Sequence, residues 1–146
     1  MPTITPPTRD GYIFNGYFKN KNGGGTKYYN ADGTSANNWN VASDTTLYAS
    51  WTPITYIIKF DKNTIDTNGK ALIGTPFGEE QEISCTYDQT IKLLGKIYSL
   101  TGYELIGWNT EKNGNQDNNY DPEEEVSNLT TTNNATVHPY DQWENK

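Results

Sequence analysis

Few residues in this chain of 146 could carry out catalysis. His138 is the only histidine, and it stands beside Pro139 near the end of the chain. A Ser-His-Asp or Cys-His arrangement would have to use this one imidazole, because the nucleophile in such a site needs a base beside it. We interpret His138 as structural, and the sequence predicts no catalytic residue and a protein that is not an enzyme.

Two acidic stretches could offer oxygen atoms to a cation. They are "DKNTIDTNG", which begins at Asp61, and "DPEEE", residues 121–125. In a calcium loop that starts at Asp61, glycine should be the sixth residue and a bidentate glutamate the twelfth. Those positions hold Asp66 and Leu72. The spacing favours solvated acidic turns, so we predict no metal site and no cofactor.

Two further features have structural explanations. The stretch "KNGGG", residues 21–25, is rich in glycine but lacks the Gly-Lys-Ser/Thr sequence and the following helix of a phosphate-binding loop. It is more typical of a hairpin turn. Cys85 is the only cysteine, so it has no internal disulfide partner, and its alternating surroundings favour a buried thiol.

Charge and hydropathy exclude several kinds of partner. The net charge is −7 with only eleven Lys and Arg, whereas nucleic-acid binding needs clustered cations to neutralise phosphates. No apolar run is long enough for membrane insertion. The start, "MPTITPPT", does not resemble an export signal, so we expect any such signal to lie outside this sequence.

The chain repeats itself. "GYIFNGYFK", residues 11–19, returns as "GYELIGWNT", residues 102–110, and "LYASW" ending at Trp51 corresponds to "PYDQW" ending at Trp143. A repeat of this kind indicates two copies of one structural unit. The predicted structural signature residues are Gly11, Tyr12, Gly16 and Trp51 in the first copy, and Gly102, Tyr103, Gly107, Trp108 and Trp143 in the second.

Periodicity predicts the elements of the second copy. Alternating apolar residues favour strands over 55–61, 81–87 and 103–109, with Tyr103 and Leu105 on one face and Ile106 and Trp108 on the other. A helical spacing over 90–101 predicts one short helix, and a last strand near 136–143 is interrupted at a proline. The order is ββαββ, an α+β class that is mostly β with one short helix.

The first copy lacks the early half of this pattern. Only two late strands are predicted in it, about residues 12–18 and 46–51. We therefore expect two domains, a partial repeat over residues 1–52 and a complete repeat over residues 53–146.

These motifs resemble the Listeria–Bacteroides repeat, which recurs as the B-repeat of internalin-type surface proteins. The family pattern "F-D-x-N-G", then "GY-x-F-x-GW", then "LYA-x-W" is matched at Phe60-Asp61, at residues 102–108 and at Trp143. The resemblance implies a β-grasp-like domain that occurs in tandem on secreted or wall-attached bacterial proteins. It further implies a non-catalytic structural spacer or adhesion module, located extracellularly or at the bacterial cell surface.

Aromatic residues leave a second interpretation open. Trp39 lies in a polar loop, and Tyr28 is the member of "YY" that the second copy does not match, so both are candidate ligand platforms. Exposed rings of this kind would make the chain a carbohydrate-binding accessory module of a larger secreted enzyme. The alternative is that both rings cap a small core. Rings that lie exposed and coplanar would favour sugar binding, and buried rings would favour the structural module.

The partial copy also predicts a partner. Two strands alone are marginally stable, and an open strand edge offers unpaired backbone groups. We expect adjacent repeats, either within this chain or on a second chain, to cover it. A glycan or a protein on the host or bacterial surface is a further expected partner.

Overall fold

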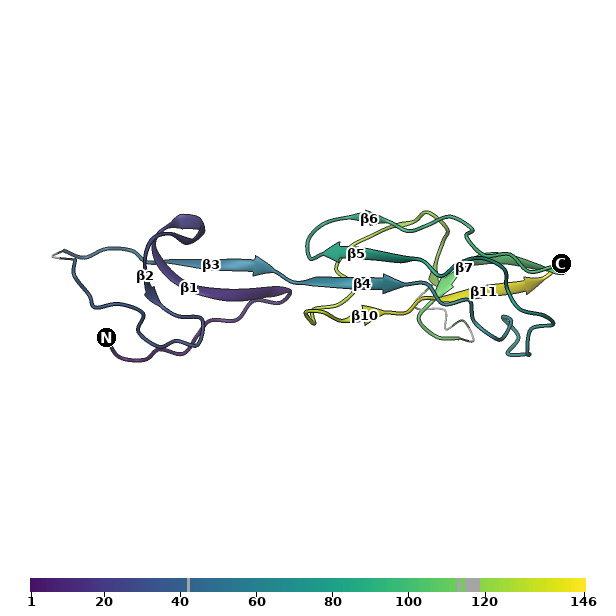
Figure 1. Cartoon of the computed structure of the whole chain (residues 1–146), viewed down its shortest axis with the longest axis horizontal. Coiled ribbons are helices and arrows are strands. Elements are labelled where there is room, and N and C mark those ends of the chain that lie inside the picture. Colours follow the sequence, from purple (N-terminus) through teal and green to yellow (C-terminus); the bar gives the residue numbers. More distant parts are fainter. Residues whose placement is uncertain (42, 113, 115–118) are drawn as a thin grey trace. The chain divides into compact units, whose positions relative to one another are not determined.

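The computed structural model describes residues 1–41, 43–112, 114 and 119–146. The chain divides into two compact units, Met1–Ile54 (the first unit) and Thr55–Lys146 (the second unit). Both are built mainly from β-strands (Figure 1).

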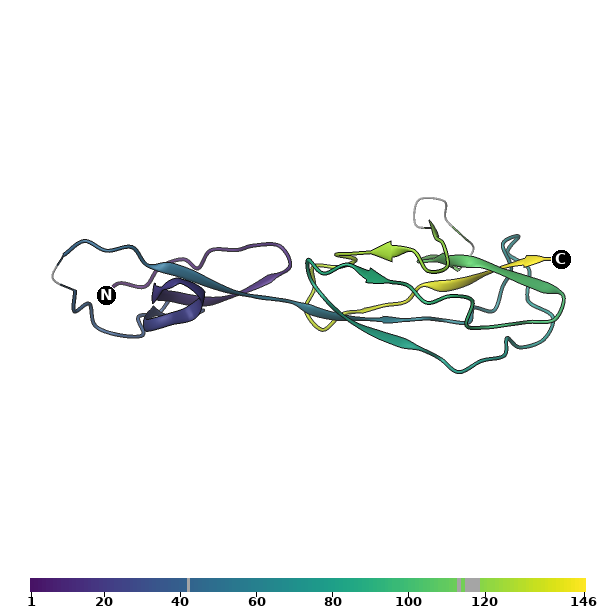
Figure 2. The same cartoon turned by 90° about the horizontal axis from the view of Figure 1, so that it is seen from above.

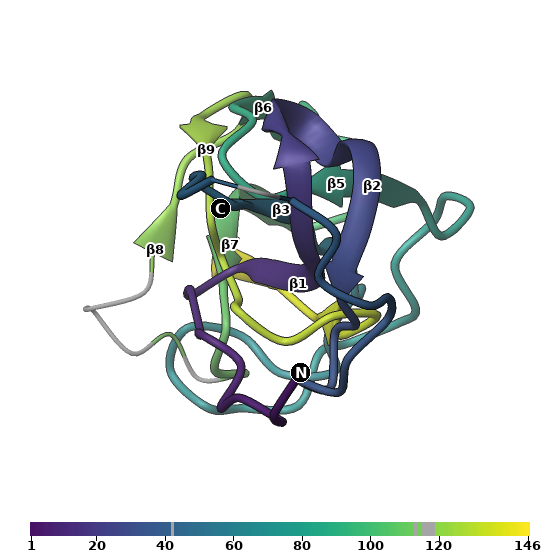
Figure 3. The same ribbon diagram turned by 90° about the vertical axis from the view of Figure 1, so that its left-hand side faces the viewer.

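The first unit contains one sheet of three antiparallel strands in the order β2-β1-β3. The strands are β1 Tyr12–Asn20, β2 Gly24–Tyr29 and β3 Tyr48–Pro53. β1 and β2 are joined by η1, a 3-10 turn at Lys21–Gly23, so the hairpin predicted at "KNGGG" is confirmed. Figure 3 shows this unit facing the viewer, with β1 and β2 side by side.

The second unit contains two three-stranded sheets and a short two-stranded one. The first has the order β10-β4-β5, with β10 Thr136–Val137, β4 Thr55–Lys59 and β5 Glu82–Thr86. The second has the order β11-β7-β8, with β11 Tyr140–Asn145, β7 Tyr103–Asn109 and β8 Asn119–Tyr120. β6 Ile91–Lys92 pairs with β9 Glu125–Val126.

Several strand predictions are confirmed. β4 and β5 form an antiparallel pair within the expected ranges, and a long loop joins them. β7 has the predicted bounds. The last strand is interrupted as expected, since His138 and Pro139 separate β10 from β11. β10 runs parallel to β4, as Figure 1 shows, and β11 runs antiparallel to β7, as the green and yellow strands in Figure 2 show.

The helix predicted over residues 90–101 is wrong, and with it the α+β, β-grasp-like ββαββ class. In the described residues the only helical segment is η1, and the protein is nearly all β. The predicted helix lies at the lower end of the roughly 12–15 residues below which isolated helices are marginal in water. Gly95 also lies in its middle, at a cost of about 1 kcal/mol relative to alanine.

In its non-helical form, this segment makes backbone hydrogen bonds to distant residues that a helix could not make. Ser99 exchanges two backbone hydrogen bonds with Phe77, and the Leu93 amide donates to the Glu124 carbonyl. Leu93 and Tyr98 are still buried in the core. Long-range backbone pairing therefore replaced local helical bonds without loss of apolar burial.

Aromatic side chains dominate the core of the second unit, as composition indicated. Phe60 and Trp108 meet with ring centroids 5.1 Å apart at 65°, a near edge-to-face contact. The predicted burial of Cys85 is confirmed. The core comprises Tyr56, Ile58, Phe60, Cys85, Leu93, Tyr98, Tyr103, Leu105, Trp108, Val126 and Trp143.

Candidate functional site

A β-bulge shapes the twin motif in the second unit. Leu105 pairs with Trp143 and Gly107 pairs with Gln142, so Ile106 is an extra residue in β7 without a partner in β11. Gly107 has φ +151°, which side-chain-bearing residues rarely adopt. A Cβ atom at this position would collide with the carbonyl oxygen of Tyr120 in β8.

The first unit repeats this geometry. Phe14 pairs with Trp51 and Gly16 with Ser50, so Asn15 is the extra residue. Gly16 has φ +127°, and a Cβ atom there would collide with the carbonyl oxygen of Tyr29. The shared glycine thus serves one function in both copies, which is to let a third strand approach the bulge.

The bulge also corrects a prediction about faces. Simple alternation placed Trp108 on the face opposite Leu105, beside Ile106. Because the extra residue shifts the alternation by one position, Leu105 and Trp108 both enter the core, while Ile106 stays 40% exposed. The face assignment of Trp108 from strict alternation was therefore wrong.

The other signature residues have structural contacts. The Tyr103 hydroxyl accepts a hydrogen bond from the Ile73 amide, and the Trp143 indole Nε1 donates to the Lys62 carbonyl at 2.8 Å. The Arg9 guanidinium lies 3.9 Å from the centre of the Tyr12 ring. Gly11 and Gly102 both precede their strands with positive φ, and Trp51 is half-buried on β3.

The structure brings the two candidate platform residues together. The Tyr28 and Trp39 rings lie 5.1 Å apart at an angle of 53°. Tyr28 is buried, and its hydroxyl donates to Oδ1 of Asn40 at 2.6 Å, whereas Trp39 is 42% exposed. The two rings are therefore neither coplanar nor jointly exposed.

We predicted a solvated acidic turn beginning at Asp61, but two of its polar residues are buried. Asn63 and Asp66 are buried, and Oδ1 of Asp66 accepts backbone hydrogen bonds from Asn68 and Lys70. The bond from the Lys70 amide contributes most to lowering the pKa of Asp66. The carboxylate therefore closes a turn instead of facing solvent.

The second acidic stretch, residues 121–125, forms a turn that leads into β9, which begins at Glu125. The Asp121 amide donates to Oε1 of Glu124 at 3.2 Å, and Glu123 adopts φ +64°. Within the described ranges, no three His, Cys, Asp or Glu side chains are grouped so that they could hold a metal ion.

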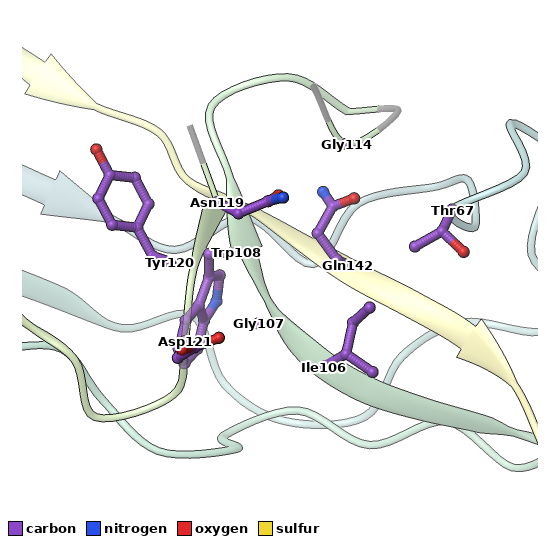
Figure 4. A pocket seen from close by; sticks show the side chains of 9 residues that line it. All are labelled: Thr67, Ile106, Gly107, Trp108, Gly114, Asn119, Tyr120, Asp121 and Gln142. Atoms are coloured by element: carbon purple, nitrogen blue, oxygen red, sulfur yellow. The ribbon is translucent and has the colours of Figure 1, made fainter. Parts of the chain in front are cut away.

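A cavity of about 280 Å³ opens beside the bulge of the second unit. Figure 4 shows Gln142 of β11 and Trp108 of β7 among the residues that line it, with Asn119 and Thr67 contributed by other segments. The Gln142 side chain donates to the carbonyl oxygens of Glu111 and Tyr140. Its own oxygen atom accepts no hydrogen bond from any described residue.

Asp141 is the residue that sequence reasoning missed. It pairs with Trp108 and is fully buried, and neither of its carboxylate oxygens accepts a hydrogen bond within the described part of the chain. Burial raises its pKa to about 8. The Trp108 indole offsets part of this rise, although the two groups do not reach hydrogen-bond geometry, and the Asp61 charge adds to it.

A signal for Asp141 was present in the repeat. Alignment of "LYASW" with "PYDQW" places it opposite Ala49, and the strand register agrees, since Ala49 pairs with Tyr17 as Asp141 pairs with Trp108. A carboxylate where the other copy has a methyl group could have been noticed from the sequence alone.

His138 is exposed at the break between β10 and β11. Across the described residues, the structure has no helix that combines the length and the apolarity required for a membrane span.

The two units are both mainly β and share the same glycine bulge, so the chain has the architecture of a tandem repeat module. The sequence profile of the Listeria-Bacteroides repeat domain matches residues 1–50 and 56–138. The chain belongs to this family, and the resemblance inferred from its motifs is confirmed.

Two relatives of this chain are larger proteins of Evansella cellulosilytica. One, named "Putative membrane protein", is 30% identical over 123 residues, which cover 79% of this chain and 16% of that protein. Another, named "Putative Gly-rich membrane protein", is 31% identical over 110 residues, which cover 75% of this chain and 12% of that protein. The chain thus spans less than a fifth of either relative. No solved structure matches it.

Proposed function

We propose that this chain is a non-catalytic structural module, a spacer that holds adhesive or other domains away from a bacterial surface. The observation that carries the proposal is the identical bulge in both units. Gly16 with Tyr29, and Gly107 with Tyr120, make the same backbone approach. The motif that the two copies share is thus accounted for by the architecture itself.

Extracellular display is part of the proposal. It is supported by membership of a repeat family associated with surface proteins and by the names of the two relatives, which describe them as membrane proteins. An antibody raised against this chain should label intact cells of the source organism as strongly as permeabilised cells. Labelling that requires permeabilisation would contradict surface display.

Carbohydrate binding is the alternative, and Trp39 is the observation that favours it. Its ring is 42% exposed and packs against the buried Tyr28 ring, which would hold the indole in place for a ligand. A glycan array probed with the intact chain distinguishes the two functions. A spacer should show no glycan binding above background.

Ile13 provides a matched control for Trp39, because it is also 42% exposed and lies in the same unit. Glycan binding that is lost in Trp39→Ala and retained in Ile13→Ala would replace the spacer with the carbohydrate-binding function. Binding that is lost in both variants would indicate nonspecific apolar contact.

A further inference from the structure

We propose that the outer edge of the first unit accepts a parallel β-strand from the first half of another repeat of this family. The acceptor edge is formed by residues 43–50, which comprise the start of β3 and the non-strand residues before it. This inference rests on the proposal that the chain is a repeat module, and it names the partner of that module.

The second unit shows how such an edge is occupied. The Asp141 amide donates to the Asp61 carbonyl, and the Asp61 amide donates to the Pro139 carbonyl. Further along, Ile57 donates to the Ala135 carbonyl, and β10 pairs in parallel with β4. The chain that leads into β11 is therefore held on its outer side by β4 and the residues that follow β4.

At the same edge of the first unit, the described residues include no such strand. The alignment that superimposes Trp51 on Trp143 places Leu47 at Pro139 and Ala49 at Asp141. Among the described residues β3 pairs with no strand other than β1, and residues 44–47 pair with no strand and are largely exposed. In the second unit, the Asp141 amide and the Pro139 carbonyl bond to the adjacent parallel segment. By analogy, the Ala49 amide and the Leu47 carbonyl are the groups that would bond to an added strand.

The apolar face beside this edge is also incompletely covered. In the second unit Trp108 and Trp143 are 0% and 1% exposed, with Phe60 against Trp108 and the Lys62 carbonyl accepting from Trp143. Their counterparts Tyr17 and Trp51 are only half-buried, although both belong to a cluster around Phe14. The segment that completes the second unit is the one the first unit lacks.

These observations specify the occupant. It should be a strand with large apolar residues at alternate positions that ends in Phe-Asp-Lys, as "YIIKFDK" does here. Its aromatic residue would cover Tyr17, its backbone would pair with residues 47 and 49, and its last carbonyl would accept from the Trp51 indole.

A synthetic peptide with the sequence of residues 54–63, "ITYIIKFDKN", is the probe. It would be titrated into the isotope-labelled intact chain and followed by amide NMR and hydrogen exchange. We expect shifts confined to residues 43–51 and to the ring neighbours of Trp51. We also expect amide exchange at Ala49 to slow at least about tenfold, since a paired amide exchanges only on opening.

N-methylation of the peptide provides a matched control. The Asp61 amide bonds to the acceptor edge in the second unit, whereas the Phe60 amide bonds to Gln81 on the other side. Methylation at the Asp61 position should weaken binding at least about tenfold, and methylation at the Phe60 position should leave the affinity nearly unchanged. The variant Ala49→Pro, which removes the edge amide, should weaken binding of the unmodified peptide similarly.

Four outcomes would overturn the inference. They are no shifts at millimolar peptide, equal effects of the two methyl groups, shifts only in the second unit through exchange with its own β4, or dimerisation of the chain alone through residues 43–51. The last would make a second copy the occupant. None of these outcomes bears on the glycan array, so failure here leaves the spacer function standing.

Discussion

Gly107 lies directly against the backbone carbonyl of Tyr120, at a position where an added Cβ atom would come closer than 3.0 Å. Gly16 has the same relation to Tyr29. In each copy the glycine terminates a bulge and the tyrosine belongs to the strand on its other side. The motif occurs in both copies because each copy needs a glycine at the bulge to let the third strand approach closely.

We predict that Gly107→Ala destabilises the second unit more than Gly102→Ala. Both glycines have positive φ, so both variants incur roughly 1–2 kcal/mol of backbone strain. Only Gly107 has a neighbour within reach of the new methyl group, because nothing lies within 4 Å at Gly102. Overpacking should therefore add about 1–3 kcal/mol at Gly107.

Urea unfolding followed by resolved NMR signals of the second unit would measure this difference. The signals of the first unit serve as an internal control, because Gly107 does not belong to it. Equal losses at the two glycines would show that the Tyr120 carbonyl moves aside at little cost.

The sequence contained enough information for the strands but too little for the helix. Buried apolar residues alternate with less buried ones along β4, and along β7 as far as Leu105, so burial of one face follows from the pattern. The spacing of Ile91, Leu94 and Ile97 fits a helix equally well. What decided against it is backbone pairing with residues 77 and 124, which are distant in the sequence.

The site was predictable only in part, for a related reason. Gly107 could be recognised as a point of close approach, but the bulge that accompanies it could not. Periodicity assumes an unbroken pleat, and one extra residue at Ile106 reverses every later side chain. Asp141 could be recognised as unusual by comparison with Ala49, but its burial depended on the parallel bridge between Asp61 and the neighbouring Tyr140.

We predict that Trp108→Ala costs about 3–5 kcal/mol in the free energy of unfolding, the range for a fully buried large aromatic residue. Trp108 is 0% exposed and packs against Phe60. Its counterpart in the first unit, Tyr17, is half-buried, so Tyr17→Ala should cost clearly less. Chemical denaturation of both variants, with each unit observed separately, provides the comparison. A larger loss at Tyr17 would mean that the first unit buries this ring in solution.

We predict that calcium leaves thermal unfolding unshifted. A bound ion would raise the melting temperature by mass action, but Oδ1 of Asp66 is already used by the amides of Asn68 and Lys70. Oδ1 of Asn63 is used similarly by Thr64. Melting curves in millimolar calcium and in chelator should coincide, with magnesium as the control for ionic strength. A calcium-specific rise would indicate that these oxygens can leave their turns.

The last prediction concerns Asp141 and pH. Its pKa is about 8 in the folded protein, against an ordinary value of 3.8, because burial disfavours the charged carboxylate. The folded state therefore keeps a proton that the unfolded state releases above about pH 4. The contribution of the protonated Asp141 carboxyl to the free energy of unfolding is fully present below about pH 4. It falls between about pH 4 and pH 8, and it is absent above that range.

Asp141→Asn removes the titration while preserving the shape of the side chain. Relative to the unmodified chain, the variant should gain stability as the pH rises from 5 to 8, since each unit of pKa difference corresponds to about 1.4 kcal/mol. Asp141→Ala, which reproduces the Ala49 of the first unit, should show the same pH trend. Asp121→Asn, at an exposed carboxyl, controls for the change in net charge. Melting temperatures measured from pH 5 to pH 8 would test this, and parallel curves for the unmodified chain and Asp141→Asn would show that the buried carboxyl finds a compensating partner when it ionises.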